Sequence, residues 1–116
     1  MNRFEAEVRA RGMTAFAHID HGAAAAALGL SLRPTELLIF GDASGNTPLM
    51  ELAQTTGIDL PLRALVWQDE SGVTWLSYSD PKWIAKRHGL RSEVVPTLSI
   101  LFAGLNEMAR SATGSP

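Results

Sequence analysis

The sequence contains no cysteine, which excludes disulfides, thiolate metal ligands and cysteine nucleophiles. It also lacks a long apolar run, because no segment reaches the roughly 20 residues that a membrane-spanning helix needs. Residues 1–13 carry charges throughout, whereas a signal peptide needs a continuous apolar stretch. From these absences we expect a cytoplasmic protein that does not bind a membrane.

A strong charge of either sign is missing as well. The 10 lysines and arginines are outweighed by 12 acidic residues, for a net charge of -2. Binding to a phosphate backbone needs a basic stripe, so we expect no nucleic-acid partner. The 116 residues, 46% of them hydrophobic, suffice for one core. We therefore expect a single domain over 1–116, with the small polar segment 111–116 as a frayed tail.

Apolar spacing and the placement of glycine and proline predict alternating helices and strands. The predicted elements are a helix over 3–11, a strand over 13–19, a helix over 21–28, a strand over 36–40, a helix after Thr47, a hairpin of 62–69 and 73–79, a helix over 82–88 and a helix over 93–110. A hairpin with helices able to cover one face predicts the α+β class. We expect a curved antiparallel sheet covered on one face by helices, including the long C-terminal helix.

Residues at the ends of these elements support the boundaries. Asp20 is predicted to cap the alanine-rich helix by accepting its free N–H groups. Thr47 is predicted to cap the next helix, with Pro48 at the first helical position. The strand over 36–40 is apolar on both faces, which predicts a central place in the sheet. Simple alternation along the first strand puts four residues on one face: Met13, Ala15, Ala17 and Ile19.

Four groups of residues resemble a known family. They are Ile19-Asp20-His21 before the alanine-rich helix, LRPTEL at 32–37 with Phe40-Gly41, GNTPLM at 45–50, and Leu60-Pro61-Leu62 followed by Trp67, Tyr78 and Arg87-His88-Gly89. In these groups the chain is similar to the bacterial and archaeal family called domain of unknown function 302. The resemblance implies a TATA-binding-protein-like fold and a homodimer, and it supplies no catalytic residue.

The densest cluster of chemically active side chains is His18-x-Asp20-His21. Two imidazoles and a carboxylate are plausible ligands for zinc or iron, and His88 would add a third imidazole if the fold brought it near. A helix N-terminus disfavours a cation, which suits His21 as a neutral ligand or a general base. The alternative is that Asp20 is only a helix cap. We favour the cap and expect no metal and no cofactor.

The glycine-bounded stretch from Gly41 to Thr47 suggests a second site. It is not a nucleotide-binding loop, because three residues separate its glycines and Asn46 stands where that loop has lysine. Free N–H groups near Thr47 would still suit a small anionic or polar ligand. The alternative is a tight turn in which Gly41 and Gly45 serve the backbone alone.

Arg33 suggests a third site, together with the aromatic residues of the hairpin. An arginine beside aromatic rings is able to clamp a carboxylate, and Tyr78, Trp67 and Trp75 are the rings in question. The alternative is that the stem of Arg33 packs on apolar surface. Trp67 and Trp75 are expected to face each other across the hairpin, where such pairs stabilise a sheet.

These patterns lead to one preferred function and two alternatives. We expect a homodimeric module that binds a small apolar or anionic ligand between sheet and helix. One alternative is an enzyme that uses His21 with Asp20 or His88, with or without a metal; the other is a purely structural or assembly protein. The candidate ligand-binding residues are Asp20, His21, Arg33, Gly41, Gly45, Asn46, Thr47 and Tyr78.

Overall fold

The computed structural model describes residues 1–90 and 95–114, and for residues 45 and 95–102 the backbone alone. Its elements are α1 (Asn2–Ala10), β1 (Thr14–Asp20), α2 (His21–Ala27), β2 (Thr35–Gly41), α3 (Ala43–Leu52), the 3-10 helix η1 (Gln54–Ile58), β3 (Leu62–Gln68), β4 (Thr74–Tyr78), α4 (Pro81–Arg87) and α5 (Val95–Thr113). None of the helices in these residues is long and apolar enough to cross a membrane.

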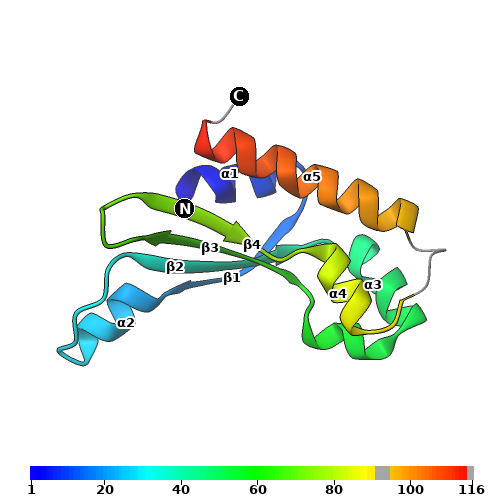
Figure 1. Ribbon diagram of the computed structural model, residues 1–116, viewed down its shortest axis with the longest axis horizontal. Helices are drawn as coiled ribbons and strands as arrows, with labels where there is room; N and C mark the ends of the chain where they lie inside the picture. Colours follow the sequence, from blue (N-terminus) through cyan, green and yellow to red (C-terminus); the bar gives the residue numbers. More distant parts are fainter. Residues whose placement is uncertain (91–94, 115–116) are drawn as a thin grey trace.

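The four strands form one antiparallel sheet in the order β1-β2-β3-β4. Helices α1 and α5 lie side by side over one face of the sheet (Figure 1). Helix α2 and the β3–β4 turn lie at one end of the sheet, here called the hairpin end; α3, η1 and α4 lie at the other, the α4 end (Figure 1). The predicted α+β class, the central position of β2 and the helix-covered curved sheet are confirmed.

The core fills the space between the sheet and the two covering helices. Phe4 and Val8 are buried on α1, four residues apart and therefore on one side of that helix. The ring of Phe4 meets the ring of Phe40 on β2 edge to face, with centroids 5.2 Å apart. Leu105 and Met108 bring the described part of α5 onto the same cluster. This packing fixes α1 and α5 on one face of the sheet.

The opposite face of the sheet carries a second set of apolar side chains. In the strand register these residues share that face: Ala17, Ile19, Leu37, Ile39, Leu65, Trp67 and Trp75. We call them the open face, because Ile19 and Trp75 are exposed and the large residues between them are only half-buried. Trp67 and Trp75 stack with centroids 6.4 Å apart, as predicted for the hairpin.

Strand β1 departs from the predicted alternation. Ala15 pairs with Phe40, and Ala17 pairs with Ile39, so two steps of β1 oppose one step of β2. This β-bulge at Phe16 moves Ala17 and Ile19 to the face opposite Ala15. The prediction that Ala15, Ala17 and Ile19 share one face was therefore wrong.

Helix α3 begins earlier than predicted. Its N-cap is Asp42, whose side chain accepts a hydrogen bond from the backbone N–H of Ser44 at 3.0 Å. Thr47 and Pro48 consequently lie inside the helix, and the predicted cap at Thr47 was wrong. Asp42 directly follows the strand and precedes Thr47 in the sequence, so its carboxylate caps the helix at an earlier residue.

The other predicted boundaries agree closely with the structure. Asp20 caps α2 by accepting from the N–H of Ala23 at 2.8 Å, and Asp80 caps α4 in the same way through Lys82. Glycines 12, 29 and 89 follow their helices with positive φ, as helix-ending glycines do. Helix α5 runs to Thr113, so residues 111–113 of the expected tail are helical, while residues 115–116 lie outside the described part.

Candidate functional site

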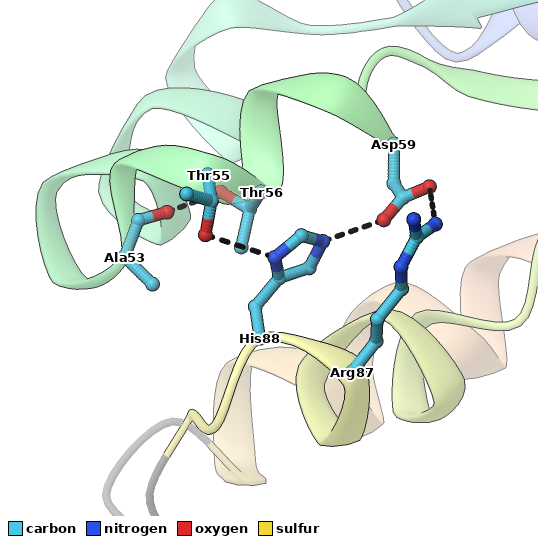
Figure 2. Close-up of polar contacts among 6 residues, drawn as sticks. All are labelled: Ala53, Thr55, Thr56, Asp59, Arg87 and His88. Atoms are coloured by element: carbon cyan, nitrogen blue, oxygen red, sulfur yellow. Dashed lines mark hydrogen bonds and ion pairs between the residues drawn. The ribbon is translucent and has the colours of Figure 1, made fainter.

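A cluster of polar side chains connects η1 to the end of α4 (Figure 2). Asp59 follows directly after η1, and His88 is the residue at which α4 ends. Asp80 and Pro81 start α4, and Gly89 stops it with φ +67, which places Arg87 and His88 at the helix C-terminus. Their side chains point across to η1 (Figure 2). A helix C-terminus favours cationic side chains, so the position suits the guanidinium of Arg87.

The imidazole of His88 has a partner on each nitrogen. Its Nε2 lies 2.5 Å from Oδ2 of Asp59, and its Nδ1 lies 2.9 Å from Oγ1 of Thr55. Arg87 donates from Nη1 to the other carboxylate oxygen of Asp59 at 2.9 Å. The side chains of His88 and Asp59 are only 7% and 16% exposed. The carboxylate is thus held by a guanidinium on one side and an imidazole on the other.

These contacts determine the roles of the ring nitrogens. An ionised carboxylate only accepts hydrogen bonds, so Nε2 of His88 carries a hydrogen and donates it to Asp59. In the neutral imidazole Nδ1 is then the acceptor, and the hydroxyl of Thr55 donates to it. The result is a hydrogen-bonded line of carboxylate, imidazole and hydroxyl.

A small cavity and an exposed tryptophan border this cluster. The cavity, of about 120 Å³, is lined by residues that include Asp59, Arg63 and Trp83. The guanidinium of Arg87 lies 5.3 Å from the centre of the Trp83 ring. This contact orients Arg87 toward Asp59 from a half-exposed surface.

A second and larger cavity lies between the hairpin and the covering helices. Its volume is about 290 Å³, and its walls come from α1, β3, β4 and α5: Met1, Arg3, Phe4, Val66, Thr74, Trp75, Leu76, Ala112 and Thr113. Most of these side chains are apolar. Arg3 is exposed, lies next to Gly114 at the end of α5, and forms no hydrogen bond or ion pair with any residue that the structure describes. Among the residues that the structure describes, this open cavity thus combines apolar surface with the exposed cation of Arg3.

The cluster predicted at His18, Asp20 and His21 is not assembled as a metal site. His21 is exposed and has no hydrogen bond with a described residue. The carboxylate of Asp20 caps α2 by accepting a hydrogen bond from its backbone. His18 contacts Glu36, with Nε2 and Oε1 3.0 Å apart. His88 lies at the other end of the sheet, since α2 and α4 are at opposite ends (Figure 1). Over residues 1–90 and 95–114, no group of three His, Cys, Asp or Glu side chains is placed to hold a metal.

In the stretch from Gly41 to Thr47, where a glycine turn was predicted, Gly41 ends β2 and residues 43–47 are helical. Gly45, Asn46 and Thr47 lie within α3, and the carboxylate of Asp42 occupies the helix N-terminus. The hydroxyl and backbone N–H of Ser44 both donate to Asp42, which lowers the pKa of that carboxyl below its ordinary value. Asn46 is buried with its side-chain amide close to Gly41. An ionised carboxylate at this helix end opposes an anionic ligand there.

The structure separates the aromatic residues predicted around Arg33. The Nε atom of Arg33 donates to the carbonyl oxygen of Gln68 at 3.2 Å, near the hairpin turn. Trp67 and Trp75 belong to the open face, whereas Tyr78 lies on the helix-covered face and donates to Oδ1 of Asn106 at 3.4 Å. The structure therefore does not place Tyr78 with Arg33. The ligand-binding role assigned to the eight candidate residues stays a prediction.

The η1–α4 cluster consists of Thr55, Asp59, Arg87 and His88, and the sequence analysis did not predict two of these residues. Thr55 and Asp59 lie in a polar stretch with no apolar periodicity, directly before Leu60-Pro61. Asp59 and His88 are 29 residues apart in sequence, so no spacing rule links them. The available signal was the group Arg87-His88-Gly89, which places an arginine and a histidine at a helix end.

Comparison with known proteins finds a family, curated relatives and a similar solved structure. The family described as "Domain of unknown function DUF302" matches residues 1–107. Two relatives, each named fluoride-specific ion channel FluC 1, are 43% identical over 98% of this chain; they come from Brucella suis and Brucella abortus. The chain spans only 45% and 42% of their lengths. An uncharacterised DUF302 protein from Bacillus stearothermophilus has a similar crystal structure, with a TM-score of 0.83, 14% identity, and coverage of 96% of this chain and 86% of that one.

Proposed function

The chain belongs to the DUF302 family, and from its structure we propose that it is a small-ligand-binding module that acts as a homodimer. The observation that carries the binding function is the 290 Å³ cavity between the sheet and helices α1 and α5. Ligand pockets of proteins usually start at about 300 Å³, so the cavity suits a small molecule. The absence of cysteine suits a reducing compartment such as the cytoplasm.

The lining of the cavity points to a class of ligand. Val66, Leu76 and Phe4 offer apolar surface to the body of a ligand, and Arg3 offers a cation at the exposed side. Because Arg3 has no partner within the described part of the chain, a ligand carboxylate would not compete with an existing ion pair. We therefore propose a small amphiphile with an apolar body and an anionic head.

Thermal unfolding with three matched probes tests this proposal. Octanoate, octanol and octylamine share the apolar body and differ in the charge of the head group. A ligand at about ten times its Kd stabilises by about 1.4 kcal/mol, which raises Tm by about 5 °C. We expect octanoate to give this shift, octanol a smaller one and octylamine none. Equal shifts for all three, or no shift for any, would contradict the proposed ligand class.

Two variants of α1 locate the binding site. Arg3→Gln should abolish the preference for octanoate over octanol, because it removes the cation from the cavity. Arg9→Gln is the matched control, since Arg9 lies on the same helix but pairs with Glu5 at 3.2 Å. If both variants change the preference equally, the carboxylate does not bind at Arg3.

The homodimer is proposed on the open face, with a second copy of this chain as the partner. The indole N–H groups of its two tryptophans are already bonded within the chain, to Ser77 and to Asp69, which leaves the rings free for apolar contact. A two-fold dimer would cover the same apolar residues on both copies.

Light scattering of two matched variants tests this dimer. Ile19→Glu puts a charge on the open face, whereas Ile58→Glu puts the same charge on η1, where the isoleucine is 64% exposed. We expect dimers for the wild type and Ile58→Glu at micromolar concentration, and monomers for Ile19→Glu. A monomeric wild type would refute the proposal.

Fluoride is a second candidate ligand. The observation in its favour is the 43% identity to proteins whose name is fluoride-specific ion channel. Adding sodium fluoride and sodium chloride at equal concentration to the same thermal experiment tests this candidate. A shift in Tm with fluoride alone would support it, and equal shifts with both salts would reject it.

A further inference from the structure

The η1–α4 cluster contains an arrangement that the binding function does not use. Asp59, His88 and Thr55 form a line in which a carboxylate orients an imidazole and the imidazole accepts from a hydroxyl (Figure 2). The same three chemical roles, in the same order, activate the hydroxyl nucleophile of acyl-transfer enzymes. Such a triad is recognised by the geometry and roles of its members, whatever fold carries them.

We propose that Thr55 is a nucleophile toward activated acyl esters, with His88 as its general base and Asp59 as a positioning residue. His88 is held rigidly, because its side chain is 7% exposed and both ring nitrogens have partners. Asp59 is held in turn by Arg87, which donates to its second oxygen at 2.9 Å. The base is therefore fixed before any substrate arrives.

The neighbouring threonine shows what a purely structural hydroxyl looks like in this segment. Thr56 is fully buried, and its Oγ1 donates to the carbonyl oxygen of Ala53 at 2.8 Å (Figure 2). Thr55 is exposed, and its hydroxyl donates to an imidazole (Figure 2). Of these two threonines, Thr55 is the one that combines a basic acceptor with access for a reagent from outside.

The chemical step is an acyl transfer. Oγ1 of Thr55 attacks the ester carbonyl, and its proton passes to Nδ1 of His88. The new Oγ1–C bond forms as the ester C–O bond breaks, and the leaving alkoxide takes the proton from His88. Water, deprotonated by the same imidazole, then hydrolyses the acyl-threonine and restores the hydroxyl. Asp59 stabilises the imidazolium that forms in both halves of the reaction.

p-Nitrophenyl acetate tests the proposal with the full chain. We expect release of p-nitrophenolate together with an acetyl group that peptide mapping assigns to Thr55. Because general-base catalysis contributes about 100-fold or more, His88→Gln should lower the rate of Thr55 acetylation by about that factor. Thr55→Val should abolish acetylation at position 55, because it removes the hydroxyl. Thr55→Ser should retain it, since the hydroxyl remains, and Asp59→Glu should recover part of the rate that Asp59→Asn loses.

The matched controls separate catalysis from folding. Thr56→Val changes the adjacent threonine, and His18→Gln changes an exposed histidine on β1; in both variants Thr55 should be acetylated at the wild-type rate. Tm of each variant is measured alongside, and Thr55→Ser carries the test if His88→Gln unfolds. Acetyl groups found only on lysines and the N-terminus, with Thr55 unmodified in the wild type and in Thr55→Ser, would overturn the proposal.

Discussion

The two ends of the sheet both combine histidine with aspartate, but they use the two residues differently. At the hairpin end, Asp20 is an exposed helix cap and His21 has no hydrogen-bond partner among the described residues. At the α4 end, Asp59 and His88 are largely buried and bonded to each other, and each has a second partner. At the α4 end an arginine and a histidine share one carboxylate in a network of side chains, while at the hairpin end the carboxylate of Asp20 bonds the backbone of α2.

The two ends of the sheet should differ most in how much stability is lost when the aspartate at each end is replaced by alanine. Asp59→Ala leaves a buried imidazole and a guanidinium without their acceptor, and a hydrogen bond to a charged group contributes about 1.5–3 kcal/mol. Asp20→Ala loses a helix cap, which costs about 1 kcal/mol. We expect the free energy of unfolding, measured by urea denaturation, to fall about 2 kcal/mol further for Asp59→Ala. Equal losses of stability for the two variants would contradict the conclusion that the two aspartates have different roles.

Replacing the histidines should give a smaller contrast. His88→Gln keeps Asp59 paired with Arg87 but breaks the link to Thr55, so we expect a loss of about 1.5 kcal/mol. His21→Gln changes an exposed side chain and should stay within about 0.5 kcal/mol of the wild type. The same urea experiment measures both variants. A destabilised His21→Gln would show that the hairpin end contains an interaction absent from the described contacts.

The smallest effect concerns acid stability at the hairpin end. The indole N–H of Trp75 and the N–H of Val73 donate to Asp69, which lowers the pKa of its carboxyl below the ordinary 3.8 in the folded state. A lowered folded pKa adds stability that is complete above the unfolded value and is lost as the pH falls through the folded one. Stability should therefore decline below pH about 4.

A pair of tryptophan variants isolates this contribution. Trp75→Phe removes the indole donor to Asp69 and should flatten the loss of stability between pH about 4 and 2. Trp67→Phe is the control, because the indole of Trp67 donates to the uncharged hydroxyl of Ser77. Thermal unfolding across this pH range measures both, and parallel curves for the two variants would rule out the Asp69 contribution.

Local signals predicted most of the fold because most helix ends are set by their own residues. Asp20 caps its helix as expected, Asp80 caps α4 in the same way, and the glycines that follow α1, α2 and α4 end them. Helix α3 was misplaced because two capping candidates compete within six residues, and Asp42 precedes Thr47. The β-bulge in β1 depends on how β1 pairs with β2, which a single strand's alternation does not reveal.

The candidate site was harder to predict than the fold, because its members meet only through tertiary packing. Thr55 lies in η1, Asp59 directly follows η1, and His88 comes from the end of α4. The sequence instead brings His18, Asp20 and His21 together, and the strand and helix geometry then separates them. Residues that are close in sequence therefore need not form a common site when they belong to different helices and strands.

The bulge at Phe16 has a consequence for the protein in concentrated solution. Strands β1 and β4 are the two edges of the sheet, and a regular edge presents unpaired N–H and C=O groups to any passing strand. The bulge interrupts that ladder on β1, and β4 is only five residues long. A bulged edge and a short edge both oppose the edge-to-edge stacking that leads to amyloid.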